Sequence, residues 1–150
     1  MTWVTKQRIK VNRAATAWLI RRFVDPEARI LFVEPEQVAE VQRRENAKGF
    51  DAPGATYPHE DAAGRCSFEA LVEEYCAGDP ALVALARIVR GADFRDQLHL
   101  TPESAGLRAI SDGFPLVTRD DCETVERAAF LYDALYASLR ERIAREGGPV

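Results

Sequence analysis

Apolar residues along much of this chain recur every three or four positions, which is the spacing of a helix with one buried face. The pattern is clearest over residues 120–146, which we predict to form one long helix that Gly147-Gly148 ends. Shorter helices are predicted where a capping residue precedes such a pattern, namely from Ser67, from Asp79-Pro80 to Gly91, and from Thr101-Pro102 to Gly113. The apolar stripe of the last helix consists of Val125, Ala129, Tyr132, Leu135, Tyr136, Leu139 and Ile143.

The first third of the chain mixes helix and strand patterns. Residues 3–11 alternate partially and predict a short strand, and RILFVEP after residue 28 predicts a buried one. Between them, RAATAWLIRRFV is apolar on most sides, which predicts a buried helix capped by Asn12 and ended at Asp25-Pro26. An exposed amphipathic helix is predicted over residues 36–47. The expected fold class is α+β, predominantly helical, with a small sheet of short strands near the N-terminus and a long C-terminal helix.

Residues 49–66 carry Gly, Pro and Asp at turn positions and predict a long loop with at most a short strand. A loop of that length inside a compact domain is more often functional or mobile than idle. The 150 residues suffice for a single domain, residues 1–150, around one core.

Charge and cysteine content narrow the functional classes. The formal net charge is −4 and the pI about 5.3, so no general attraction to nucleic acid is expected. The start, MTWVTKQRIK, lacks the apolar core of a signal peptide, and no stretch approaches the roughly 18 apolar residues of a membrane span. Cys66, Cys76 and Cys122 are odd in number and widely spaced, which is typical of a reducing compartment. We therefore expect a cytoplasmic protein.

The loop segment YPHEDAAGRCSFE contains His59 and Cys66 among the acids Glu60, Asp61 and Glu69. Imidazole and thiolate are ligands for transition metals, and a thiol before a helix start is favoured as thiolate by the helix dipole. The alternative is a solvated loop histidine above a small buried residue. Spacing alone favours this alternative, because no metal-ligand motif is complete.

Arginines and carboxylates supply further candidates. Arg13 lies in the first turn of a predicted helix, where a cation is unfavourable unless an anion or carboxylate compensates it. Arg22 and Arg90 lie near helix ends, and for each arginine a structural ion pair competes with oxyanion binding. Asp93 follows a predicted helix end, and Asp133 lies in the mainly apolar AFLYDALY, where a carboxylate needs an arginine, a hydroxyl or a metal as its partner.

Four segments, NRAATAWLIRRFVDPEA, FDAPGATYPHEDAAGRCSFEAL, DPALVALARIVRGAD and YDALY, occur in this order along the chain. Together they resemble the C-terminal domain family of the bacterial chromate-resistance protein ChrB, over residues 3–138. The family has Asp, Cys and Pro where this chain has Asn12, Thr16 and Ala17, so a mechanism that relies on that acid or thiol is in doubt here. The resemblance implies a role in chromate resistance, with regulation of an efflux operon the usual assignment.

Given the resemblance, we expect a site around the 57–69 loop. Its predicted metal ligands are His59, Asp93 and Asp133, for zinc, iron or manganese. Its predicted anion-binding residues are Arg13, Arg22 and Arg90, and Cys66 is the candidate redox thiol.

Two functions from different classes follow. The first is a sensor or accessory module that binds a metal or a small oxyanion and lacks a DNA-binding region of its own. The second is a metal-dependent hydrolase or redox enzyme, in which the histidine and carboxylates hold the metal that activates water. A third alternative is a helical interaction protein that pairs with a copy of itself or with a partner protein. We expect neither direct nucleic-acid binding nor a membrane partner.

Overall fold

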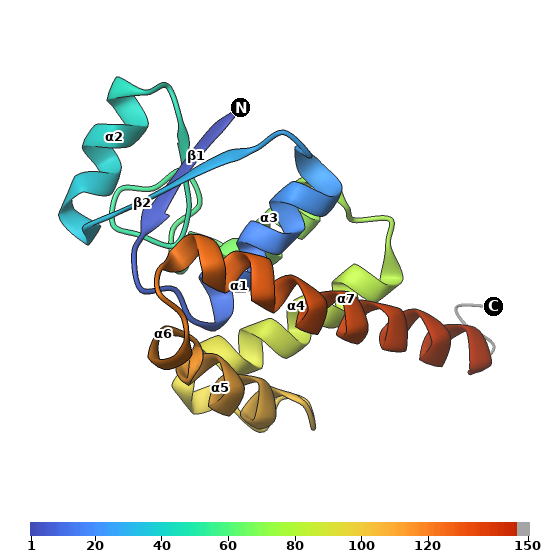
Figure 1. Cartoon of the computed structure of the whole chain (residues 1–150). Helices are drawn as coiled ribbons and strands as arrows, with labels where there is room; N and C mark the ends of the chain where they lie inside the picture. The colour runs from blue at the N-terminus through green and yellow to red at the C-terminus, as the bar shows by residue number, and fades with distance from the viewer. Residues whose placement is uncertain (147–150) are drawn as a thin grey trace.

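A parallel sheet of three short strands lies at one end of the molecule (Figure 1). In the computed structural model, which describes residues 1–146, the central strand β1 (Thr2–Lys6) pairs with β2 (Arg29–Val33) and with β3 (Lys48–Gly49). Trp3 and Val4 of β1 are both fully buried but pack into two different apolar clusters. Successive strand residues point to opposite faces, so the small sheet is covered on both sides.

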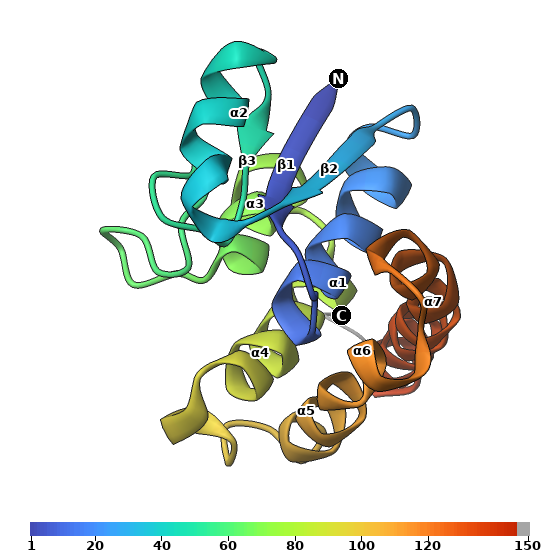
Figure 2. The same cartoon turned by 60° about the vertical axis from the view of Figure 1, so that its left-hand side comes forward.

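Helices make up most of the remaining chain, as the sequence pattern predicted. Figure 2 shows α1 between the sheet and the helical layer formed by α4, α5 and α7. The helical elements are α1 (Val11–Leu19), the π-helix η1 (Ile20–Val24), the 3-10 helix η2 (Pro35–Gln37), α2 (Val38–Arg44), α3 (Ser67–Tyr75), α4 (Pro80–Asp93), the 3-10 helix η3 (Arg95–Gln97), α5 (Ser104–Asp112), α6 (Phe114–Val117) and α7 (Asp121–Arg145).

Helix α1 is the centre of the fold. It packs against α3, α4, α5 and α7, and each of its residues except Arg13 is buried. This confirms the predicted buried helix as far as Leu19. The rest of the predicted segment is the π-helix η1, which ends before Asp25 and in which only Ile20 is buried. The prediction for the amphipathic α2 is confirmed too, because Val38 and Val41 are its buried residues.

The structure corrects several predicted boundaries. Helix α1 begins at Val11 after the N-cap Lys10, so Asn12 lies inside the first turn and its side chain is free to bond to other elements. Cys66, and not Ser67, is the N-cap of α3. Only Ile30 of β2 is buried, because β2 is an edge strand of the sheet.

Gly91 was predicted to end α4, but the helix continues to Asp93. A Cβ at Gly91 would lie 2.2 Å from Oγ of Ser104 and 3.0 Å from the carbonyl oxygen of Gln97. The glycine is therefore selected by the close approach of α5 to α4, and not by a helix end. Helix α5 itself begins at Ser104, whose amide donates to Oγ1 of Thr101 (3.1 Å).

Gly91→Ala should therefore lower the free energy of unfolding by about 1–3 kcal/mol, because α5 must shift to admit the methyl group. Gly106→Ala is the matched control: a methyl group at this position of α5 would meet no atom within 4 Å, and there alanine should stabilise by up to about 1 kcal/mol. Urea unfolding of both variants measures the difference. Equal stability of the two variants would contradict the close packing of α4 on α5.

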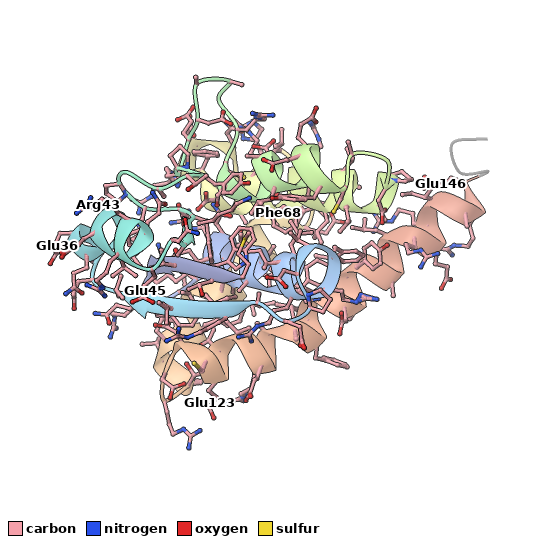
Figure 3. All side chains as sticks on the ribbon, turned by 90° about the horizontal axis from the view of Figure 1, so that it is seen from above. Glu36, Arg43, Glu45, Phe68, Glu123 and Glu146 are labelled. Carbon is pink, nitrogen blue, oxygen red and sulfur yellow. The ribbon has the colours of Figure 1, made fainter. Side chains whose placement is uncertain are left out.

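Residues 50–66 contain no helix, as predicted, and return to the sheet through a bridge between Phe50 and Tyr57. Figure 3 shows Phe68, just after this loop, in the interior, whereas the labelled Glu36, Glu123 and Glu146 lie at the periphery. Helix α7 is the predicted long C-terminal helix, and its predicted end at Gly147-Gly148 lies outside the described residues. Within residues 1–146, no helix combines the length and the apolar character that a membrane crossing requires.

Candidate functional site

Three segments that are far apart in the sequence meet at the start of α1. Helix α1 contributes Asn12 and Arg13, the 50–66 loop contributes Asp51 and His59, and the last residue of α4 is Asp93. We call these five residues the polar cluster. They come together because α1 packs on α4 and the loop leaves the sheet beside them. The prediction that His59, Asp93 and Arg13 share one region therefore agrees with the geometry.

Asn12 links the cluster to the core. Its Oδ1 accepts hydrogen bonds from Oγ1 of Thr16 (3.0 Å) and Oγ of Ser67 (3.1 Å), and its Nδ2 donates to Oδ2 of Asp93 (3.1 Å). The two hydroxyl donors fix the amide orientation, so the NH₂ group faces the carboxylate. The amide of Asn12 gives Asp93 a hydrogen-bond donor. The aspartate found at this position in the family that the chain resembles would instead add a third carboxyl group beside Asp51 and Asp93.

His59 lies between two carboxylates. Its Nδ1 is 3.0 Å from Oδ1 of Asp51 and 3.5 Å from Oδ2 of Asp93. Both carboxylates are largely buried, with exposed fractions of 5% and 13%, whereas the imidazole is half exposed and lies against the ring of Phe94. The second oxygen of Asp51 is 3.5 Å from Nη1 of Arg13. The imidazole therefore covers a buried pair of acids from the solvent side.

This arrangement favours bound protons. The hydrogen bond to Asp51 raises the pKa of His59 above its usual 6.5, against the effect of burial. Burial, with the charge of Asp51, raises the pKa of Asp93 to about 6 from 3.8. A carboxyl group with a raised pKa contributes its stabilisation below pH 4 and loses it as the pH rises through about 6. Near neutral pH the cluster is therefore close to a change of charge.

Arg13 carries an unsatisfied donor. Its Nη2 donates to the carbonyl of Arg8 (3.1 Å) and its Nη1 faces Asp51, but its buried Nε has no hydrogen-bond partner. Ser111 Oγ is the other buried side-chain polar atom without a partner among residues 1–146. A buried donor without an acceptor costs about 1–3 kcal/mol, so a bound oxygen ligand at this place would recover free energy.

A cavity of about 140 Å³ lies beside the cluster. It holds a few molecules the size of water at about 30 Å³ each, which is also the scale of a tetrahedral oxyanion. The N-terminus of α1 lines it, and this terminus has neither a side-chain cap nor an acidic residue in its first turn. The lining residues are Lys10, Val11, Asn12, Arg13, Asp51, Asp93, Arg108 and Asp112.

The cations of the cavity are held in place by short-range contacts. Nη1 of Arg108 donates to the carbonyl of Ala92 (3.1 Å), and its Nε lies 3.9 Å from Asp112. Nζ of Lys10 lies 4.0 Å from the same carboxylate of Asp112. Three cations and three carboxylates thus face one cavity, and protonation of the His59–Asp93 pair shifts the balance towards positive charge.

Asp133 and Arg22 were predicted to belong to this site, but their contacts lie elsewhere. Asp133 accepts a hydrogen bond from Nε1 of Trp18 (2.9 Å) and lies 3.4 Å from Nη1 of Arg22. Arg22 also lies over the rings of Phe23 and Tyr136. These contacts join the π-helix η1 to α7, and they provide Asp133 with the partners that its place in an apolar segment required.

Arg90 and Cys66 hold the far end of the loop. Arg90 donates to the carbonyl of Gly64 (2.6 Å) and to Glu69 (2.8 Å), and Glu69 also accepts from the amide of Cys66 (2.9 Å). The thiol of Cys66 is fully buried, and burial raises its pKa, so the thiolate is disfavoured. The geometry thus supports a loop-positioning role for both residues.

Metal ligation has less support from this geometry. Among residues 1–146, no group of three or more His, Cys, Asp or Glu side chains is arranged to hold a metal ion. In the cluster, Asp51 and Asp93 both face the same nitrogen of His59, Arg13 faces the second oxygen of Asp51, and Asn12 donates to the Asp93 oxygen that faces His59. The predicted zinc, iron or manganese site stays a prediction.

Sequence reasoning missed Asp51, Lys10 and Arg108 as site residues. Asp51 precedes Ala-Pro-Gly and has the pattern of a turn residue, and its φ of 51° is indeed in the left-handed region that aspartate tolerates better than most residues. Such conformations cluster at functional sites, but only the structure shows this one. Arg108 has the pattern of an ordinary exposed helix residue, and its contact with the end of α4 depends on tertiary packing.

Asp51→Asn should lower the pKa of His59, because the variant removes the negative charge that favours the imidazolium and leaves only a neutral amide oxygen as the acceptor. An NMR titration of the His59 imidazole resonances in both proteins measures the change. An unchanged His59 titration in the variant would contradict the 3.0 Å contact.

The four segments that resemble the family can be located in this structure. The first and the third contain the residues that α1 and α4 contribute to the polar cluster, and the second contains its loop. Residues 3–139 match the family model described as ChrB, C-terminal domain. The chain belongs to the ChrB C-terminal domain family. Its curated relative "Protein ChrB" from Cupriavidus metallidurans is 34% identical over 137 residues, which cover 89% of this chain and 39% of that protein. No solved structure matched.

Proposed function

We propose that this ChrB C-terminal domain is a sensor or accessory module of chromate resistance that binds a tetrahedral oxyanion at the start of α1. The observation that carries the proposal is the buried, unpartnered Nε of Arg13 beside the cavity. Arginine donors recognise oxyanions through several directed hydrogen bonds, and an uncapped helix N-terminus adds backbone donors of matching polarity. Lys10 and Arg108 supply further positive charge.

The carboxylates of the cavity make this binding dependent on protons. Ionised Asp93 repels an anion, whereas its protonated form is neutral and can donate a hydrogen bond. Its pKa of about 6 and the raised pKa of His59 keep the pair protonated at mildly acid pH. We therefore expect an oxyanion to bind with uptake of protons, and to be released as the pH rises.

Calorimetric titration of the purified chain with chromate and with sulfate tests this proposal. Both anions are tetrahedral, and sulfate keeps its charge between pH 6 and pH 8, so it isolates the protonation of the protein. We expect saturable one-site binding that is tighter at pH 6 than at pH 8, with planar nitrate as the negative control. If neither chromate nor sulfate binds saturably at pH 6 or at pH 8, the proposal is overturned.

Divalent-metal binding at the polar cluster is the second candidate function. It is favoured by one observation, the convergence of two carboxylates on His59 Nδ1, which a metal could bridge in place of the proton. The domain would then serve as a metal sensor or as part of a metal-dependent enzyme. Elemental analysis of the chain purified without chelator, beside His59→Ala, decides: stoichiometric metal lost in the variant would favour this function over the first.

A further inference from the structure

The outer face of α7 is not covered by the rest of the described chain, residues 1–146. Phe130 is 79% exposed, which is unusual for an aromatic side chain in the middle of a long helix. It lies opposite the buried stripe of α7, and its exposed neighbours one and two turns further on are the small residues Ala134 and Ala137. Figure 1 and Figure 2 both show α7 at the outside of the helical layer. A second helix could therefore approach this face closely.

Charges along α7 and its N-terminal flank are arranged symmetrically about Phe130, with opposite signs at equal separations. Arg127 and Asp133 lie three residues before and after it, Asp120 and Arg140 lie ten residues away, and Arg119 and Glu141 lie eleven residues away. All six side chains belong to exposed residues. The other acids before the centre, Asp121, Glu123 and Glu126, correspond to Leu139, Ala137 and Ala134, so no pair over residues 119–141 joins like charges.

This symmetry has a direct consequence for two copies of the chain. When two identical helices pack antiparallel about a two-fold axis through one residue, each residue before that centre lies opposite the residue equally far after it in the other copy. Within α7, an axis through Phe130 places Arg127 opposite Asp133, and this pair occurs twice. Asp120 is the N-cap of α7 and Arg119 precedes it, so both flank the helix end that lies beside Arg140 and Glu141 of the other copy. A helix with one exposed aromatic residue and charges of a single sign would place like charges opposite each other in such a pair.

We propose that α7 is a self-association surface, on which a second copy of this chain packs antiparallel with the two Phe130 rings at the two-fold axis. The rings bury each other's exposed apolar area, Ala134 and Ala137 permit close approach of the helices, and the three charge pairs fix the register. The polar cluster at the start of α1 is not needed for this contact, so the inference stands apart from the proposed function.

A charge exchange at the outermost pair tests the register. Arg119 and Glu141 are 83% and 73% exposed, and each forms an ion pair with a residue four positions away in the same chain. Arg119→Glu or Glu141→Arg alone places like charges opposite each other twice, and should raise the dimer dissociation constant about tenfold. The double variant exchanges both charges and should restore wild-type affinity. Failure of the double variant to recover would overturn the antiparallel register.

Sedimentation equilibrium of the whole chain provides the measurement. Phe130→Lys should leave only monomer, while its lysine pairs favourably with Glu126 four residues earlier and so keeps the helix intact. Val83→Lys is the control, because Val83 is half exposed on α4, away from this face. This variant should remain dimeric. A wild-type chain that is monomeric at all concentrations, or a Phe130→Lys variant that still dimerises, would overturn the proposal.

Discussion

Replacing Trp18 by alanine should lower the free energy of unfolding by about 3–5 kcal/mol, the largest effect on stability that we expect from one substitution. Trp18 is only 4% exposed, and its ring contacts those of Phe23, Tyr132 and Tyr136 at centroid distances of 5.5–6.0 Å. The substitution empties the junction between α1, η1 and α7 and leaves Asp133 without its indole donor.

Urea or guanidinium unfolding measures this loss, with Trp18→Phe as the matched control. Phenylalanine keeps most of the aromatic volume but lacks the indole N–H, so its cost should be clearly smaller than that of alanine. The comparison separates packing from the hydrogen bond to Asp133. A loss below about 1 kcal/mol in Trp18→Ala would contradict the central position of this ring.

Replacing Arg13 by glutamine should weaken oxyanion binding about a hundredfold, which corresponds to about 3 kcal/mol. The Arg13 side chain is only 14% exposed, lines the cavity and carries a buried Nε donor without a partner, so a cation from solvent does not replace it. Glutamine keeps a polar end of similar reach but has neither the charge nor the planar fork of donors.

Two further variants sharpen this prediction, and all are compared by calorimetric titration with sulfate. Arg13→Lys keeps the charge without the fork, so its affinity should lie between those of the wild type and Arg13→Gln. Arg22→Gln is the control, because Arg22 pairs with Asp133 on another face and should not affect the anion. Equal affinity in Arg13→Gln and Arg22→Gln would show that the anion binds elsewhere.

Most helices followed from the sequence because their apolar spacing and caps are local signals. Asp79 with Pro80 predicts the start of α4, and Asp79 does accept hydrogen bonds from the amides of Ala81 and Leu82. The predicted end at Gly91 was wrong because a glycine can be selected by a neighbouring helix as well as by a turn. The pattern of one segment does not distinguish these two causes.

The candidate site was only partly predictable, for a related reason. His59 and Asp93 were identified by residue type and by family resemblance, and they do lie together. Asp133 was grouped with them because a carboxylate in an apolar segment needs a partner, yet Trp18 and Arg22 satisfy it 111–115 residues away in sequence. Which partner such a carboxylate finds depends on helix packing, and this information is not local.

The most direct test of oxyanion binding at the start of α1 is the position of the chromium atom in crystals grown with chromate. Anomalous scattering at the chromium absorption edge locates that atom independently of the protein atoms. We predict one strong peak in the cavity lined by Lys10, Arg13 and Arg108. A peak at the Arg22–Asp133 pair, or no peak at saturating chromate, would contradict oxyanion binding in this cavity.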